Sequence, residues 1–247
     1  MLINPLRKGI EHGQPRAIFF DILKVLIGTF SGAFLAFLAN WLLRQSQRED
    51  DQIAAGNLAI TVMGRMVNAF LIYKRGVIET RTQILSAEPN LPVWMQMLPI
   101  LHEFDESLVI DMQSLTFLFR PGSVDVMNHI LIAQGKYRNL VYLHKQHFKD
   151  MQELQRILSE LQGDDQYGPI NLDFAVKKVP AYLAARIESA STALHQSLNE
   201  DENTMIEALK ALEKTLASNL GKGRTIRISL PSQLISTKLV DDPKQPS

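Results

Sequence analysis

The chain has 247 residues and a formal net charge of zero, with 26 basic and 26 acidic side chains. A neutral chain has no overall electrostatic attraction to DNA or RNA, so we expect no nucleic-acid partner. Cysteine is absent, which excludes disulfides, thiolate metal sites and cysteine nucleophiles. The apolar content of 46% fits a folded protein that also carries one membrane span.

An uncharged stretch from Val25 to Leu43 lies between Lys24 and Arg44. It is about 19 residues long, which as a helix crosses a hydrocarbon layer of about 30 Å. Inside lipid, a single segment satisfies its backbone polar groups only as a helix. We therefore predict a flexible tail over residues 1–15 and a transmembrane helix with its flanks over residues 16–48. A cleaved signal peptide is the alternative, although no small-x-small cleavage pattern closes the apolar run.

Basic residues near the apolar stretch set the expected orientation. Four lie before it and two lie after it: Arg7, Lys8, Arg16 and Lys24, then Arg44 and Arg48. The side richer in basic residues stays in the cytoplasm. We therefore expect a single-pass protein of the cell membrane, with a cytoplasmic N-terminus, an extracytoplasmic C-terminal domain and the lipid bilayer as a partner.

Small or polar residues recur every four positions along one face of this predicted helix: Gly28, Gly32, Ala36 and Asn40. Such a face lets two helix backbones approach closely, and an asparagine can hydrogen-bond across the contact. The face predicts a homodimer, or docking on a partner membrane helix. The alternative is ordinary composition, because glycine is common in membrane helices.

The rest of the chain carries three stretches with apolar residues at helical spacing. No proline occurs between residues 16 and 88, so the membrane helix is expected to continue as one helix to about Ser86. A second long helix is predicted from residue 123 to about residue 162. Its apolar positions repeat every seven residues, as in a coiled coil. A third is predicted from residue 172 or residue 180 to residue 219.

The expected fold class is all-α. The single transmembrane helix continues into an up-down-up bundle of three long helices over residues 49–223, with a short distal helix at residues 111–120. The proline-rich segment 87–101 is expected to form a lid over the bundle end, or alternatively a partner-binding patch. Residues 224–247 are expected to be an extended or disordered tail, because a lone strand has no partner.

Two histidines, His144 and His147, fall on inward-facing rows of the second helix, where apolar residues are otherwise the rule. In the expected bundle their neighbours are Asn68, Glu188 and Ser191, and these five residues form a candidate buried polar layer. Three interpretations stay open. The histidines form a hydrogen-bonded core pair, a pH sensor, because histidine titrates near neutral pH, or part of a metal site.

Burial and pairing predict opposite pH dependences for this layer. If burial dominates, the histidines are neutral, their pKa values lie below about 6.5, and stability is lost as the pH falls. If Glu188 pairs with either ring, the sign reverses. Asp150 continues the spacing of the two histidines but is expected to turn partly away. We expect no bound metal or cofactor, because the remaining ligands of a metal site are not recognisable.

Catalytic patterns are weak in this sequence. The stretch Gly221-Lys-Gly-Arg224 follows a predicted helix instead of preceding one, so it is not a phosphate loop. The cluster His102, Glu103 and Asp105 is expected to be a solvated acidic turn, with a metal site as the alternative. We therefore expect a membrane-anchored interaction or scaffold protein that is not an enzyme. The alternative is a helical bundle that senses a ligand, a metal or protons.

Overall fold

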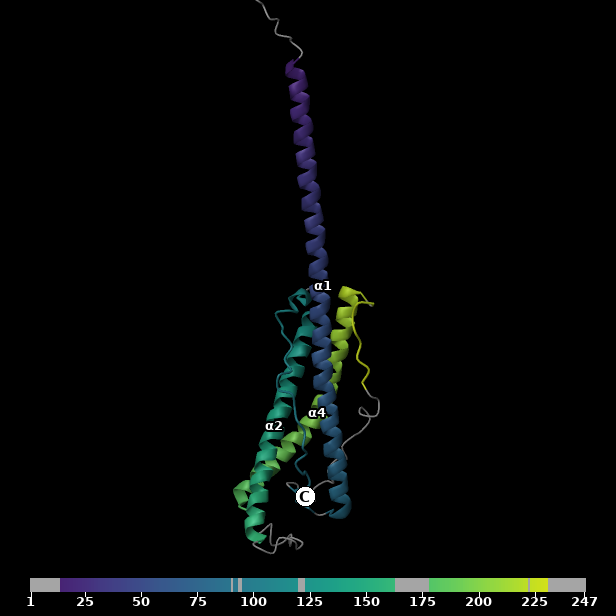
Figure 1. The fold of residues 1–247 in the computed structure, drawn as a ribbon. Coiled ribbons are helices and arrows are strands. Elements are labelled where there is room, and N and C mark those ends of the chain that lie inside the picture. The colour runs from purple at the N-terminus through teal and green to yellow at the C-terminus, as the bar shows by residue number, and fades with distance from the viewer. Residues whose placement is uncertain are drawn as a thin grey trace, which may run out of the picture. The chain divides into compact units, whose positions relative to one another are not determined.

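The computed structural model describes residues 14–89, 91–92, 95–119, 123–162, 178–221 and 223–230. Their long elements are three α-helices, α1 (Gln14–Ala87), α2 (Val124–Gln162) and α4 (Ala181–Leu220), as Figure 1 shows. No strand occurs among the described residues. The prediction of an all-α fold with three long helices is therefore confirmed.

The chain divides into two compact units, residues 1–51 and residues 52–247. In the first unit every described side chain from residue 19 onward is exposed. Its part of α1 contains the apolar stretch, and among the described helices α1 is the one long and apolar enough to cross a membrane. This finding concerns length and composition.

The second unit begins with the later part of α1, which presents an apolar stripe to the core. Ile60, Met63, Val67 and Phe70 are each at most 1% exposed. Alternating steps of three and four residues keep these side chains on one helix face. They share one core cluster with residues of α2 and α4, such as Leu140 and Leu209.

The ends of the second and third helices agree with their sequence signals. α2 begins one residue after the predicted Ser123 and ends at the predicted Gln162. α4 begins directly after Pro180, the later of the two predicted starts. Proline lacks a backbone N–H and has a fixed φ, so it is tolerated at a helix start. The earlier start, Leu172, lies outside the described residues.

The directions in which the helices run differ from the prediction. α4 meets the other two helices in opposite chain order, through the pairs Gly56–Leu216, Lys74–Glu202 and Arg81–His195 with α1, and Lys136–Asp201 and Asp150–Arg186 with α2. Both helices are therefore antiparallel to α4 and parallel to each other. The up-down-up order is wrong.

The connection between α1 and α2 explains this difference. In its described parts it runs back along α1, because Gln96 contacts Arg81, Ile100 lies next to Gly76, and Asp105 pairs with Arg65. A short connection would make α1 and α2 antiparallel neighbours. Because the connection instead runs back along α1 before α2 begins, α2 runs in the same direction as α1.

The short helix predicted at residues 111–120 is reduced to the 3-10 turn η2 (Thr116–Leu118). Leu115 and Leu118 are fully buried, so apolar contacts hold this turn. The returning connection brings η2 to the end of the bundle where α2 starts, and the expected distal position is therefore also wrong.

Candidate functional site

Three polar residues of α2 form one buried row. His144, His147 and Asp150 are 8%, 2% and 0% exposed. Their spacing of three residues places them on the same helix face. Asp150, which was expected to turn partly away, is the most deeply buried of the three. Each member of the row has different partners.

His144 lies in an aromatic cluster. Its Nδ1 is 3.1 Å from the hydroxyl of Tyr73, and its ring packs edge-on against Tyr73 and Phe104. Burial lowers the pKa of His144, the charges of His102 and Lys145 lower it further, and a hydrogen bond with the His102 backbone opposes them. Burial raises the pKa of Tyr73, so its hydroxyl stays protonated beside the imidazole of His144.

Among the described histidines, His147 has the most strongly lowered pKa. Burial lowers its pKa to about 4, the charge of His144 acts in the same direction, and Asp150 and a hydrogen bond with the Met97 backbone oppose them. The ring is therefore neutral at pH 7. Within the described part of the chain, His147 Nε2 and the buried Ser191 Oγ have no hydrogen-bond partner. Each atom left unsatisfied in this way costs roughly 1–3 kcal/mol.

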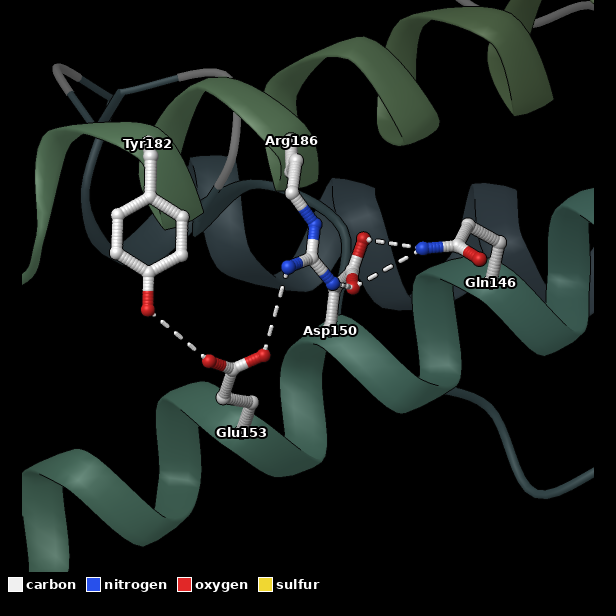
Figure 2. Close-up of polar contacts among 5 residues, drawn as sticks. All are labelled: Gln146, Asp150, Glu153, Tyr182 and Arg186. Atoms are coloured by element: carbon white, nitrogen blue, oxygen red, sulfur yellow. Dashed lines mark hydrogen bonds and ion pairs between the residues drawn. The ribbon is translucent and has the colours of Figure 1, made fainter.

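Asp150 ends the row in a polar network that joins α2 to α4 (Figure 2). Its carboxylate accepts hydrogen bonds from Arg186 and, at 3.1 Å from each oxygen, from the Gln146 amide. Arg186 also lies 3.7 Å from Glu153, whose other oxygen accepts a hydrogen bond from Tyr182 at 3.2 Å. A buried carboxylate persists only when such partners compensate its lost hydration.

The structure brings together only part of the predicted layer. Ser191 is fully buried, whereas Asn68 and Glu188 are exposed and lie outside it. For Asn68 the reason is the direction of α2: with α1 parallel to α2, the α1 residue that faces His144 is Tyr73. Glu188 lies on an exposed face of α4, and Arg186 is the α4 residue that reaches Asp150 of α2.

Further along α4, two buried carboxylates pair with the other helices. Glu202 accepts from Lys74 of α1 at 2.5 Å, and Asp201 pairs with Lys136 of α2 at 2.8 Å. Ser197 also donates to Asp201. The sequence showed an acidic stretch at this place and a lysine, Lys74, within the apolar stripe of α1. Lys136, whose side chain is 41% exposed, gave no such signal.

The cluster expected in the connection is divided between two environments. His102 packs against Tyr73 and Phe104, and burial lowers its pKa. Asp105 instead pairs with Arg65 at 3.0 Å, and hydrogen bonds from Ser107 are the main cause that lowers its pKa. No group of three or more His, Asp or Glu side chains suited to a metal ion is found among the described residues.

The small-residue face of the first unit is open. Gly28, Gly32, Ala36 and Asn40 are all exposed. A Cβ atom added at Gly28 or Gly32 would meet no other atom within 4 Å. Association through this face stays a prediction.

An open apolar pocket of about 750 Å³ lies between the end of α1, the connection and α2. Its lining combines large apolar side chains with two polar ones: Ile84, Leu91, Met95, Leu98, Pro99, Met151, Leu154, Gln155, Leu158 and Ser159. Trp94, the largest side chain of the expected lid, lies outside the described residues. The choice between a lid and a partner-binding patch stays open.

No family model, curated protein or solved structure matches this chain.

Proposed function

We propose that this protein is a single-pass membrane protein whose helical second unit acts as an interaction or scaffold module. The observation that carries the proposal is the exposed apolar surface of the first part of α1. Phe30 and Phe37 are 77% and 67% exposed, and Lys24 is the last charged residue before Arg44. Exposed apolar area costs roughly 25 cal/mol per Å² in water, and a bilayer covers such a helix on every side.

Features of the second unit support the interaction role. Its three helices are fixed to one another by an apolar core and by ion pairs between helices, such as Lys74–Glu202 and Arg186–Asp150. A scaffold fixed in this way can present a surface to a partner with little reorganisation. The apolar pocket beside the end of α1 is one such surface.

Extraction of membranes tests the anchor. We expect the full chain to stay in the membrane pellet after washing with alkaline carbonate and to enter solution only with detergent. A matched variant with Phe30→Lys and Phe34→Lys should be held less well in the membrane pellet, because two charges at the centre of a span cost several kcal/mol. Release of the unmodified chain by carbonate alone would overturn the anchor.

A second candidate function is a response to acid, and the neutral, buried His147 favours it. A fold that keeps this ring uncharged is destabilised when the pH falls far enough to protonate it. Loss of this fold at acidic pH would release the contacts that His144 and His147 make with the returning connection. If the candidate is right, replacing His147 with leucine should reduce the loss of stability in acid.

A further inference from the structure

Residues 224–230 are held against α1 through their backbone. The Asn57 side-chain amide donates to the carbonyl oxygen of Arg224 at 3.2 Å and accepts from the N–H of Ile226 at 3.0 Å. Residues 223–225 form a turn and a bend, and residues 226–230 lie in neither a helix nor a strand. One side chain of a helix therefore holds two backbone groups of this segment.

The same segment places one side chain in a space made by a glycine. Ile228 lies over Gly64 of α1, and a Cβ atom at Gly64 would overlap the Ile228 side chain. The Ile228 N–H donates to Glu213 of α4 at 2.8 Å. Ile228 and Leu230, two residues apart, both pack on the core, whereas Ser229 between them is exposed. Alternate side chains therefore point toward the helices.

We propose that the surface formed by Asn57, Gly64 and Glu213, called the groove below, is a recognition site for a peptide segment of a partner protein, with residues 224–230 as its internal occupant. Peptide-binding proteins commonly obtain affinity from backbone hydrogen bonds and specificity from pockets for alternate side chains. The groove has both features. The fitting segment carries apolar side chains at two alternate positions, the first of them over Gly64.

This inference rests on the proposed function as an interaction module, for which it names the class of partner. The internal occupant is weakly held. Both of its hydrogen bonds with Asn57 are exposed to solvent, and Ile226 is 41% exposed. The fully buried members of the main core belong to the helices and the connection between α1 and α2, while Ile228 and Leu230 are only partly buried. Segments with few buried contacts open locally without global unfolding.

Binding of a synthetic peptide to the full chain in detergent tests the proposal. The probe is a fluorescent peptide with the sequence of residues 223–230, and its anisotropy is measured with three chains. They are the unmodified chain, Ile228→Asp, in which the internal segment is released, and Ile228→Asp with Gly64→Leu, in which the groove is also filled. A peptide carrying Asp in place of its isoleucine corresponding to Ile228 is the control probe.

We expect the Ile228→Asp chain to bind the peptide about tenfold more tightly than the unmodified chain, because an occupied groove lowers the fraction of competent molecules. The chain with the filled groove and the control probe should show no saturable binding. If Ile228→Asp unfolds the chain, Ile226→Pro replaces it. That variant removes the Ile226 N–H, whose hydrogen bond Asn57 accepts, and leaves the groove unchanged. Ile226 is an exposed position of the segment.

Three results would overturn the proposal: no binding to a folded chain with a released segment, equal binding to the filled groove, or concentration-dependent dimers of the unmodified chain through exchanged segments. The last result would assign the groove to a second copy. Carbonate extraction separates this failure from failure of the proposed function. A chain that stays in the membrane but binds no peptide keeps its anchor and loses the groove.

Discussion

At the scale of single residues, the burial of His147 makes the stability of the fold depend on pH. The pKa of His147 is about 4 in the folded chain and about 6.5 in the unfolded chain. Between these values the unfolded chain binds a proton that the fold does not. Stability is therefore complete above pH 6.5 and falls as the pH drops to about 4, by up to about 3 kcal/mol.

We expect His147→Leu to remove most of this acid-induced loss, since leucine cannot take up a proton. The free energy of unfolding is measured in urea at pH 7 and pH 4.5. His129→Leu is the matched control, because His129 lies on the same helix and is exposed. A His147→Leu chain that loses as much stability in acid as the unmodified chain would contradict the assignment.

The burial of Asp150 predicts that two ion-paired basic residues, Arg186 and Lys145, contribute unequally to stability. Arg186 pairs with Asp150, whose side chain is 0% exposed, and Lys145 pairs with Glu106, whose side chain is 61% exposed. Removing the partner of a buried charge costs about 3 kcal/mol or more, whereas a surface ion pair contributes less than about 1 kcal/mol. Arg186→Met should therefore be much more destabilising than Lys145→Met in urea unfolding. Equal costs would mean that water reaches Asp150.

At the scale of the elements, two glycines in helices predict unequal outcomes for the same substitution. Gly135 of α2 is exposed, and a Cβ atom there meets nothing within 4 Å. Gly135→Ala should stabilise the fold by about 1 kcal/mol, through the higher helix propensity of alanine. At Gly56 of α1 the added atom would lie 2.9 Å from Leu216, so Gly56→Ala should gain less or destabilise. Unfolding free energies in the reverse order would contradict this packing.

Association of the first unit belongs to the same scale. Gly32→Ile should weaken dimers in the membrane by about 1–2 kcal/mol, because a branched side chain prevents close approach of two helices. Leu38→Ile is the control, since Leu38 lies off the row of small residues. Chemical crosslinking in native membranes measures the dimer fraction. Equal crosslinking of the two variants would show that this face does not mediate association.

The helices themselves could be predicted from the sequence, but the directions in which they run relative to one another could not. Apolar spacing and proline positions act within about four residues, so they predicted α1, α2 and the start of α4 after Pro180. The direction of α2 depends on the return of the connection along α1, which contacts such as Arg81–Gln96 and Arg65–Asp105 hold. These pairs lie 15 and 40 residues apart, and a local pattern carries no information about them.

The same difference between local patterns and distant contacts explains which parts of the candidate site could be predicted. The inward direction of His144 and His147 follows from the period of α2 alone, and both are buried as predicted. Their partners depend on which level of α1 faces them, so the parallel order places Tyr73 beside His144 and leaves Asn68 exposed. The backbone contacts of Asn57 with residues 224–226 likewise join distant segments.

At the scale of the whole molecule, the distribution of charge predicts a topology. Net charge is zero over the chain, so long-range attraction gives no preferred side, and the orientation depends on the basic residues nearest the span. Four of them precede the apolar stretch, and two, Arg44 and Arg48, follow it. The acidic run Glu49-Asp50-Asp51 comes next. Acidic residues contribute little to orientation.

A reporter that is active only in the cytoplasm, fused after Ser247, tests this topology. We expect low activity for the unmodified chain, because the excess of basic residues keeps its N-terminal side in the cytoplasm. The matched variant combines Arg16→Gln and Lys24→Gln with Gln45→Lys and Gln47→Lys. It reverses the bias to two basic residues before the span and four after it, and should raise the activity. Strong activity of the unmodified fusion would instead place the second unit in the cytoplasm, where the groove at Asn57 would meet a different set of partners.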